Sequence, residues 1–517
     1  MTAKQSDNKR IVQNTLSLYF RMFITISIGL FTSRVVLNTL GVSDFGVFSL
    51  VGGLVLSIAF LNTGMLQASQ RFLSYELGRG DDDGLKKVFS TSLCIHIAIA
   101  LLVILLSETI GVYLINCKLN IPTDRVFAAN WVFQCSIFTF VVSVLSVPYN
   151  SCIVAHEHMS FYAYISILEA VLKLLIVYLL VLASWDKLVF YAVLLLCVQI
   201  IIRFIYTLYC NWHFSECHAK LTFEKPVFIK MFTFAGWSIV GNLGYSFRDQ
   251  GTSIILNLFF GTVVNAARGV ASHVSVMINS FATNVTMALN PPITKNYAAG
   301  NYERSAQLVY AGSRAAFYLL SLLTIPFLIN SEYILHLWLG VVPKNTSLFL
   351  YFILASSLLY SMSQPVTVAI QATGKIKVFQ ILVCSLMLVE LIATYIVLKL
   401  TGRLLYSLIP ALIANTFAVF LRFFLLKRMV PIYSWWTYVF NVFLRSTLVF
   451  VICFFCSYTI HRYVHVPNFF LFLGESVLYV GIVLFFVAIL GLDKAERIIV
   501  YKKASSVISN KLKHGKA

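Results

Sequence analysis

The sequence predicts an all-α integral membrane protein with about 14 transmembrane helices. Of its 517 residues, 59% are hydrophobic and 11% are charged, and the mean hydropathy is +0.85. Apolar stretches of about 20 residues recur along the whole chain, each long enough to cross a hydrocarbon core of roughly 30 Å. Because no water reaches that depth, backbone groups must pair within the segment, which favours helices. Barrel strands would appear as short alternating segments, and the sequence shows none.

The predicted helices follow one another with short connections. They cover 11–38, 45–70, 88–115, 126–152, 159–183, 188–212, 230–259, 262–290, 305–330, 347–372, 378–399, 403–426, 438–460 and 469–491. No small-residue cleavage site follows the first helix, so we expect it to be retained rather than removed as a signal peptide. The longest loops on the side opposite the N-terminus, 117–125 and 331–346, are too small for catalytic domains.

The formal net charge of +19 reflects membrane topology. With the N-terminus in the cytoplasm, 23 of the 39 Lys and Arg residues fall in loops on that side and 7 in the opposite loops. This bias follows the positive-inside rule and predicts that both termini are cytoplasmic. We therefore expect a multi-pass protein of the bacterial inner (cytoplasmic) membrane, with membrane lipids rather than nucleic acid as partners.

An internal repeat organises the chain. A shift of 220 residues places Leu40-Gly41 on Phe260-Gly261, Gly80 on Gly300 and Ser92 on Gly312. Each unit then holds six helices, and an even number gives the two halves the same orientation, as in parallel transporter repeats. The predicted domains are an N-lobe (1–212), a cytoplasmic linker (213–229), a C-lobe (230–428), two appended helices (429–492) and a basic tail (493–517). The tail is either an amphipathic helix on anionic lipid or a solvated segment.

One helix carries a polar stripe. Its members are spaced three or four residues apart and share one helical face: Asn265, Arg268, Ser272, Ser275, Asn279, Thr283, Thr286 and Asn290. The stripe faces either a hydrated cavity or another helix, where Ser and Thr serve as packing residues. Three Asn and one Arg exceed what packing needs, so we favour a cavity. The helix at 347–372 has a weaker stripe, and Pro365 is expected to bend it: Ser356, Tyr360, Ser363, Thr367 and Gln371.

Ionisable residues within the spans are costly and indicate function. The cations are Arg21, Arg34, Lys173, Arg203, Arg248, Arg268, Arg314, Arg422 and Arg445, and the anions are Glu108, Glu169, Asp249, Glu390 and Glu475. The cationic surplus favours an anionic substrate, and Arg suits a diphosphate because it donates two parallel hydrogen bonds. Arg34 and Arg268 are the strongest ligand candidates.

Several of these charges have structural alternatives. Arg21, Arg203, Arg314 and Arg422 lie nearer helix ends, where snorkelling to headgroups is the alternative. Glu169 and Lys173 have the spacing of a structural ion pair, and Arg248 is a candidate for pairing across a helix interface. Asp249, Glu169 and Glu390 are candidates for binding a coupling ion, Na⁺ or H⁺.

The sequence contains no strong catalytic motif. Asp81-Asp82-Asp83 resembles the metal site of sugar-nucleotide transferases, but a solvated turn between glycines is the better interpretation. His156-Glu157-His158 occupies a tight turn, and no Walker loop, nucleophile elbow or HExxH is present. The ten cysteines mostly lie within spans. We therefore expect no enzyme, no cofactor, no metal site and no disulfide framework, and transport would run on a gradient or on product consumption.

Two groups of motifs resemble those of Wzx-like polysaccharide flippases (O-antigen or capsule type). They are Asn265-Ala266-Ala267-Arg268-Gly269-Val270-Ala271 with Pro291-Pro292-Ile293-Thr294-Lys295 and Ala299-Gly300-Asn301, and Leu40-Gly41-Val42-Ser43-Asp44-Phe45-Gly46 with Gly52-Gly53. That family belongs to the MOP superfamily with the MATE exporters and MurJ. The resemblance implies two six-helix lobes around an alternating cavity and an undecaprenyl-diphosphate-linked oligosaccharide as substrate. It also implies that Arg34, Arg248 and Arg268 hold the diphosphate, and it makes other polysaccharide-assembly proteins candidate partners.

Two alternatives remain open at the level of sequence. A cation-coupled MATE-type multidrug antiporter would need cavity carboxylates for its cationic cargo, and this sequence has surplus Arg within its spans. A membrane glycosyltransferase or polymerase acting on the same lipid-linked sugars would need a sizeable outward loop with acidic or His residues, which the sequence lacks.

Overall fold

The structure is a computed structural model. It describes residues 3–56, 60–117, 123–182, 186–218, 222–260, 262–339, 342–463, 468–493 and 497. This part of the chain is built of helices and contains no strand. Within it, 11 helical segments are long and apolar enough to cross a membrane. The predicted all-α membrane fold is confirmed.

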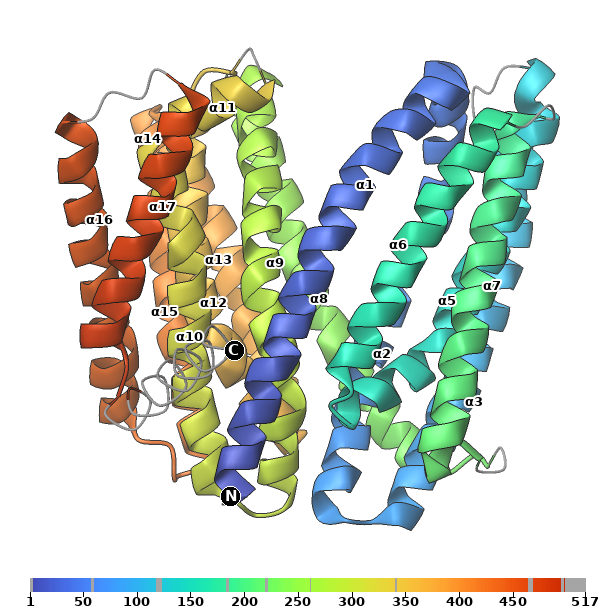
Figure 1. Cartoon of the computed structure of the whole chain (residues 1–517), viewed down its shortest axis with the longest axis horizontal. Helices are drawn as coiled ribbons and strands as arrows, with labels where there is room; N and C mark the ends of the chain where they lie inside the picture. The colour runs from blue at the N-terminus through green and yellow to red at the C-terminus, as the bar shows by residue number, and fades with distance from the viewer. Residues whose placement is uncertain are drawn as a thin grey trace, which may run out of the picture. The chain divides into compact units, whose positions relative to one another are not determined.

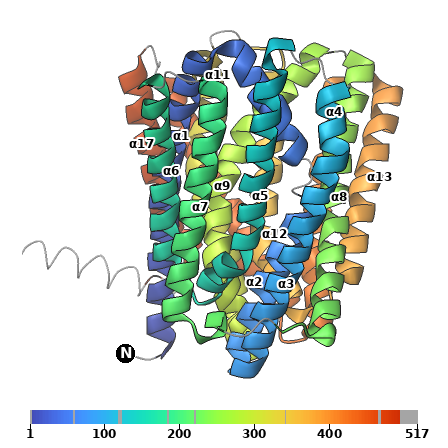
Figure 2. The ribbon, with the colours of Figure 1, turned by 90° about the vertical axis from the view of Figure 1, so that its right-hand side faces the viewer.

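The helices succeed one another along the chain; Figure 1 labels the long ones, and Figure 2 labels α4. They are α1 (Ala3–Leu56), α2 (Phe60–Arg79), α3 (Asp82–Leu106), η1 (Ser107–Gly111), α4 (Val112–Cys117), η2 (Thr123–Arg125), α5 (Val126–Ala155), α6 (Met159–Leu182), α7 (Lys187–His213), η3 (Ser215–His218), α8 (Lys225–Phe260), α9 (Thr262–Ala298), α10 (Tyr302–Ile329), α11 (Ser331–Leu339), α12 (Thr346–Thr373), α13 (Lys377–Thr401), α14 (Leu404–Ser407), α15 (Ile409–Met429), η4 (Thr437–Leu444), α16 (Arg445–Tyr463), α17 (Phe469–Phe486) and η5 (Val487–Gly491). The segments η1, η4 and η5 are π-helical, and η2 and η3 are single 3₁₀ turns.

The helix boundaries differ from the predicted ones near the N-terminus. The predicted loop at 39–44 is wrong, because α1 continues through it to Leu56. A glycine inside a helix costs only about 1 kcal/mol relative to alanine, so Leu40-Gly41 does not have to interrupt α1. The predicted span 262–290 corresponds to α9, which is not among the 11 apolar segments. Its polar stripe lowers its hydropathy, although α9 is a continuous helix of 37 residues.

The chain divides into two compact units. Unit 1 comprises Met1–Gly244, Met287–Ser305 and Val368–Cys384, and unit 2 comprises Tyr245–Thr286, Ala306–Thr367 and Ser385–Ala517. The helices α8, α9, α10, α12 and α13 each contribute residues to both units. The domain boundaries expected from the repeat, with lobes at 1–212 and 230–428, stay a prediction.

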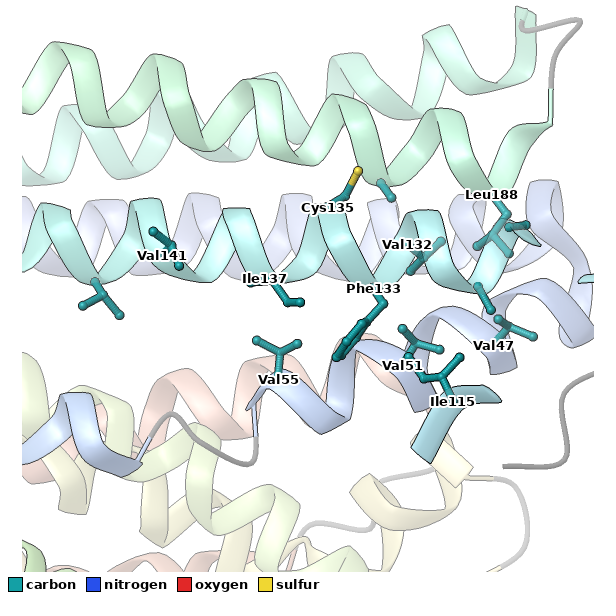
Figure 3. Close-up of a cluster of buried hydrophobic side chains, with 14 of the residues drawn as sticks. Val47, Val51, Val55, Ile115, Val132, Phe133, Cys135, Ile137, Val141 and Leu188 are labelled. Atoms are coloured by element: carbon teal, nitrogen blue, oxygen red, sulfur yellow. The ribbon is translucent and has the colours of Figure 1, made fainter. Parts of the chain in front are cut away.

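In unit 1, α5 is the central helix. It packs against α1, α2, α3, α6 and α7, and Figure 2 shows α5 and α7 side by side. Figure 3 shows the apolar cluster that α5 buries, in which Phe133 meets Val51 and Val55 of α1. The Phe133 ring lies against Gly111, where an added Cβ would collide with it. A glycine at the end of η1 therefore allows this aromatic side chain to fill the core.

Unit 1 also holds the two turns that the repeat aligns. Gly80 joins α2 to α3 with φ +70°, and Gly300 joins α9 to α10 with φ +78°. This left-handed conformation favours glycine at a helix C-terminus. Asp81 then caps α3, accepting a hydrogen bond from the Gly84 amide at 2.8 Å. The acidic triplet at 81–83, interpreted from the sequence as a solvated turn, directly follows the Gly80 turn and begins α3, with Asp82 and Asp83 exposed.

Candidate substrate cavity

Unit 2 contains a cavity of about 460 Å³, a size typical of small-molecule sites. It is lined by residues of α8, α9, α12, α13, α14 and α15. The polar lining residues are Tyr245, Arg248, Asp249, Thr252, Arg268, Ser272, Ser275, Asn279, Ser356, Ser357, Tyr360, Glu390, Thr394, Ser407 and Asn415. A cavity this polar in a membrane-spanning helical protein indicates a hydrated site.

Two ion pairs lie on the wall of this cavity. Arg248 of α8 faces Glu390 of α13, with Nη1 and Oε2 separated by 3.6 Å. Arg268 of α9 pairs with Asp249 of α8 and donates a hydrogen bond to Ser253. The Glu390 side chain is 6% exposed, whereas that of Asp249 is 56% exposed. Two sequence-predicted arginines and two candidate coupling carboxylates therefore line one site.

Arg422 of α15 lies behind the lining residues and is 3% exposed. It donates hydrogen bonds of 2.8 Å to Ser363 and to the Tyr245 hydroxyl, and its guanidinium lies 5.6 Å from the Tyr360 ring. Within the described part of the chain, none of the residues that contact Arg422 is an anion. Its Nε atom has no hydrogen-bond partner there. The predicted snorkelling of Arg422 to headgroups is wrong, because interior hydroxyl groups hold the side chain instead.

The polar stripe of α9 has two structural roles. Arg268, Ser272, Ser275 and Asn279 line the cavity. Ser275 also shares a 2.9 Å hydrogen bond with Ser357 of α12, and the Asn279 amide donates to Ser357 at 2.8 Å. This part of the stripe therefore faces a cavity and joins two helices, so the two alternatives predicted for it coexist.

Thr283, Thr286 and Asn290, the other members of the stripe whose side chains the structure describes, do not line the cavity. Thr283 and Thr286 donate hydrogen bonds to the α9 backbone at Asn279 and Ala282. Asn290 belongs to unit 1 and accepts a 3.5 Å hydrogen bond from Thr294. The side chain of Asn265 lies outside the described residues.

The stripe of α12 is divided in a similar way. Ser356 and Tyr360 line the cavity, while Ser363 accepts the Arg422 hydrogen bond beneath it. Thr367 donates to the Ser363 carbonyl at 3.0 Å. Gln371 belongs to unit 1, where its carbonyl accepts a hydrogen bond from Arg71.

Other charged candidates have structural partners. Glu169 forms a 2.6 Å ion pair with Lys173 in α6, the arrangement that their spacing indicates. Arg314, predicted to snorkel, is 4% exposed and pairs with Asp493 at 2.7 Å. Arg445 binds the same carboxylate and the Leu492 carbonyl. The side chain of Arg34 lies outside the described residues.

Comparison with solved structures identifies the fold. A MATE transporter in the straight conformation matches with a TM-score of 0.71 and 15% identity, covering 82% of this chain and 96% of that one. The fold is that of the MATE transporters. The outward-facing structure of a multidrug resistance MATE family transporter of the MOP superfamily matches with a TM-score of 0.67 and 14% identity over 81% of this chain and 96% of that one.

A mutant MATE transporter of Vibrio cholerae matches the same MATE fold. Its TM-score is 0.66 and its identity 16%, over 83% of this chain and 98% of that chain. No family model and no curated protein matches the sequence. The MATE fold therefore supports the predicted architecture, and the substrate has to be argued from the cavity.

Sequence reasoning missed several residues around the cavity. Ser357, Thr394, Ser407 and Asn415 are single polar positions on otherwise apolar helices. Tyr245 lies one helical turn before Asp249, and this spacing is the signal that could have indicated it. Arg422 could be recognised from the sequence as a charge within a span, but its hydroxyl partners Ser363 and Tyr245 could not.

Proposed function

We propose that this protein is a membrane transporter that works by alternating access and translocates an undecaprenyl-diphosphate-linked oligosaccharide from the cytoplasmic to the periplasmic leaflet. The observation that carries the proposal is the charge of the cavity in unit 2. Arg248 and Arg268 are balanced by Glu390 and Asp249, whereas Arg422 is a buried cation with hydroxyl partners. The site therefore has a surplus positive charge.

A bound diphosphate would neutralise this surplus positive charge while the helices around the cavity stay in place. The phosphate oxygens would accept hydrogen bonds from Arg268 and Arg248, which exchange their carboxylates for the ligand. Tyr245 accepts a hydrogen bond from Arg422, and this polarises its own O–H toward an incoming anion. In this scheme the sugars occupy the hydrated cavity beside the Ser and Asn side chains, and the polyprenyl chain stays in lipid.

A second candidate is a cation-coupled multidrug antiporter, which the solved MATE structures support at least as well. The observation in its favour is Glu390, a nearly buried carboxylate in the cavity wall. A carboxylate in this position is suited to bind a proton, Na⁺ or a cationic drug. In that case Arg248 would release Glu390 during the transport cycle.

Ligand binding to the purified full chain distinguishes the two candidates. The probes are a fluorescent polyprenyl diphosphate carrying a short glycan and a fluorescent cationic drug. The proposal predicts saturable binding of the diphosphate lipid that inorganic diphosphate competes away, weakened at least about tenfold (about 1.4 kcal/mol) by R268Q. R462Q, which changes an exposed arginine of α16, is the matched control. Binding of the cationic drug alone, lost in E390Q, would establish the antiporter instead.

A further inference from the structure

A cluster of metal-ligand side chains lies in unit 1, where the end of α5 meets η3. Cys152 and His156 are one helical turn apart at the end of α5, and Glu216 and Cys217 are adjacent in η3. The ligand atoms of Cys152, His156 and Glu216 all lie within 4.8 Å of one another. The sulfur of Cys217 is 3.9 Å from that of Cys152. Two segments separated along the chain by α6 and α7 therefore bring four donor groups near one another.

The three ligand atoms of Cys152, His156 and Glu216 are close enough to share one ion, and the Cys217 sulfur has to move toward His156 and Glu216 to complete a tetrahedral site. With Zn–S bonds of about 2.3 Å, two sulfur ligands of one Zn²⁺ lie about 3.8 Å apart, close to the 3.9 Å seen between Cys152 and Cys217. His156 Nε2 and Glu216 Oε1 are 2.7 Å apart, and Cys152 Sγ lies 3.0 Å from the same oxygen. An entering ion would replace these direct hydrogen bonds, which requires these atoms to separate by about half an ångström.

The charge of the cluster also points to a cation. Glu216 is 1% exposed, and its side-chain partners are the Cys152 thiol and the His156 imidazole. Among the described residues no Lys or Arg pairs with this carboxylate. A buried carboxylate is costly without a positive partner or metal. The Phe214 ring stacks on His156 at 4.1 Å and restricts the orientation of the imidazole.

We propose that Cys152, His156, Glu216 and Cys217 bind one Zn²⁺ in a closed structural site. Two sulfurs, one imidazole nitrogen and one carboxylate oxygen fill the four positions that Zn²⁺ prefers, which leaves none for water or substrate. Binding releases the protons of the two thiols, and the ion stays divalent throughout. The ion clamps the end of α5 to the segment that leads from α7 toward α8.

The sequence predicts no metal here, because His156 has only Glu157 and His158 beside it along the chain. The structure separates that triplet. Glu157 has φ +66° and pairs with Lys295 at 2.9 Å, and His158 bonds the Tyr209 hydroxyl at 2.8 Å. The partner carboxylate of His156 lies 60 residues further along the chain. This site stands independently of the transported substrate.

The test measures metal bound to the full chain, purified in detergent without a polyhistidine tag. Elemental analysis is expected to find one zinc per chain. After the metal is removed under reducing conditions, cobalt(II) is expected to restore a tetrahedral spectrum with thiolate-to-cobalt charge-transfer absorption. The variants C152S and H156Q should each lower Zn²⁺ affinity at least about tenfold. C197S, which changes an exposed cysteine of α7 outside the cluster, should leave it unchanged.

The zinc content and cobalt spectrum of the wild-type protein test the proposal even if a variant fails to fold. Zinc present in it at one equivalent, with the charge-transfer band in the cobalt form, supports the site. Absence of zinc together with no thiolate-to-cobalt band would overturn it. A disulfide between Cys152 and Cys217 in protein purified under reducing conditions would also overturn it, since oxidised sulfurs cannot bind the ion.

Discussion

Arg248 and Glu390 face each other across 3.6 Å in the wall of the unit 2 cavity. The arginine comes from α8 and the glutamate from α13, so the pair connects two helices as well as lining the site. The guanidinium has hydrogen-bond donors to offer an anion once the carboxylate releases it. Breaking the pair should therefore lower the stability of unit 2 and at the same time free Arg248 to bind the substrate.

Removing the Glu390 charge is expected to affect stability and anion binding in opposite directions. E390Q leaves Arg248 without its anion inside the protein, which should destabilise unit 2 by about 1–3 kcal/mol. The freed guanidinium should bind a polyprenyl diphosphate roughly fivefold more tightly, since a partly exposed ion pair is worth about 1 kcal/mol. Thermal unfolding in detergent and fluorescence titration measure the two effects. Weaker anion binding in E390Q would contradict the assignment of Arg248 as a ligand.

Arg422 should matter for function far more than for folding. R422M replaces a buried, uncompensated cation with an apolar side chain of similar length, a change that is often neutral or stabilising. We expect its midpoint of thermal unfolding to stay near that of the wild type while diphosphate-lipid binding falls at least about tenfold. Loss of the fold in R422M would show that Arg422 is a structural residue.

Arg445 provides the opposite case. Its guanidinium binds Asp493 and the carbonyls of Leu490 and Leu492. R445M removes the bonds of Arg445 to these acceptors, while Asp493 keeps Arg314 and the Leu492 carbonyl keeps Arg497, so we expect a loss of about 1 kcal/mol in stability. Binding of the diphosphate lipid to the protein that remains folded should be unchanged. A selective loss of binding would place Arg445 in the substrate path.

The turn at Gly80 predicts a contrast between two glycine substitutions. G80A forces a side chain into a φ of +70° and should destabilise unit 1 by about 1 kcal/mol. G236A lies on an exposed face of α8 with open space around it, so the higher helix propensity of alanine should stabilise the helix by up to about 1 kcal/mol. Equal shifts of the unfolding midpoint in both variants would contradict the left-handed backbone conformation of Gly80 in the turn between α2 and α3.

Features that lie within a single helix could be predicted from the sequence. The α9 stripe could be recognised because its members repeat at helical spacing, and four of them line the cavity. Apolar length predicted the membrane helices for the same reason. The predicted boundary at Leu40-Gly41 is wrong because a single glycine costs a helix only about 1 kcal/mol and does not by itself end it.

Features made by distant segments could not be predicted in this way. Arg422 bonds Ser363 and Tyr245, which lie 59 and 177 residues away in the sequence. Periodicity within α15 does not show which hydroxyl groups surround its arginine. The sulfur, nitrogen and oxygen donors at the end of α5 likewise come together only when η3 folds against it.

Translocation by the reconstituted full chain tests the central proposal most directly. A fluorescent undecaprenyl-diphosphate oligosaccharide is incorporated into both leaflets of proteoliposomes, and the fraction protected from an external quencher is followed with time. The account predicts protein-dependent translocation that R422M slows at least about tenfold while R462Q does not. Translocation at the wild-type rate in R422M, or movement of organic cations with no movement of the lipid, would contradict it.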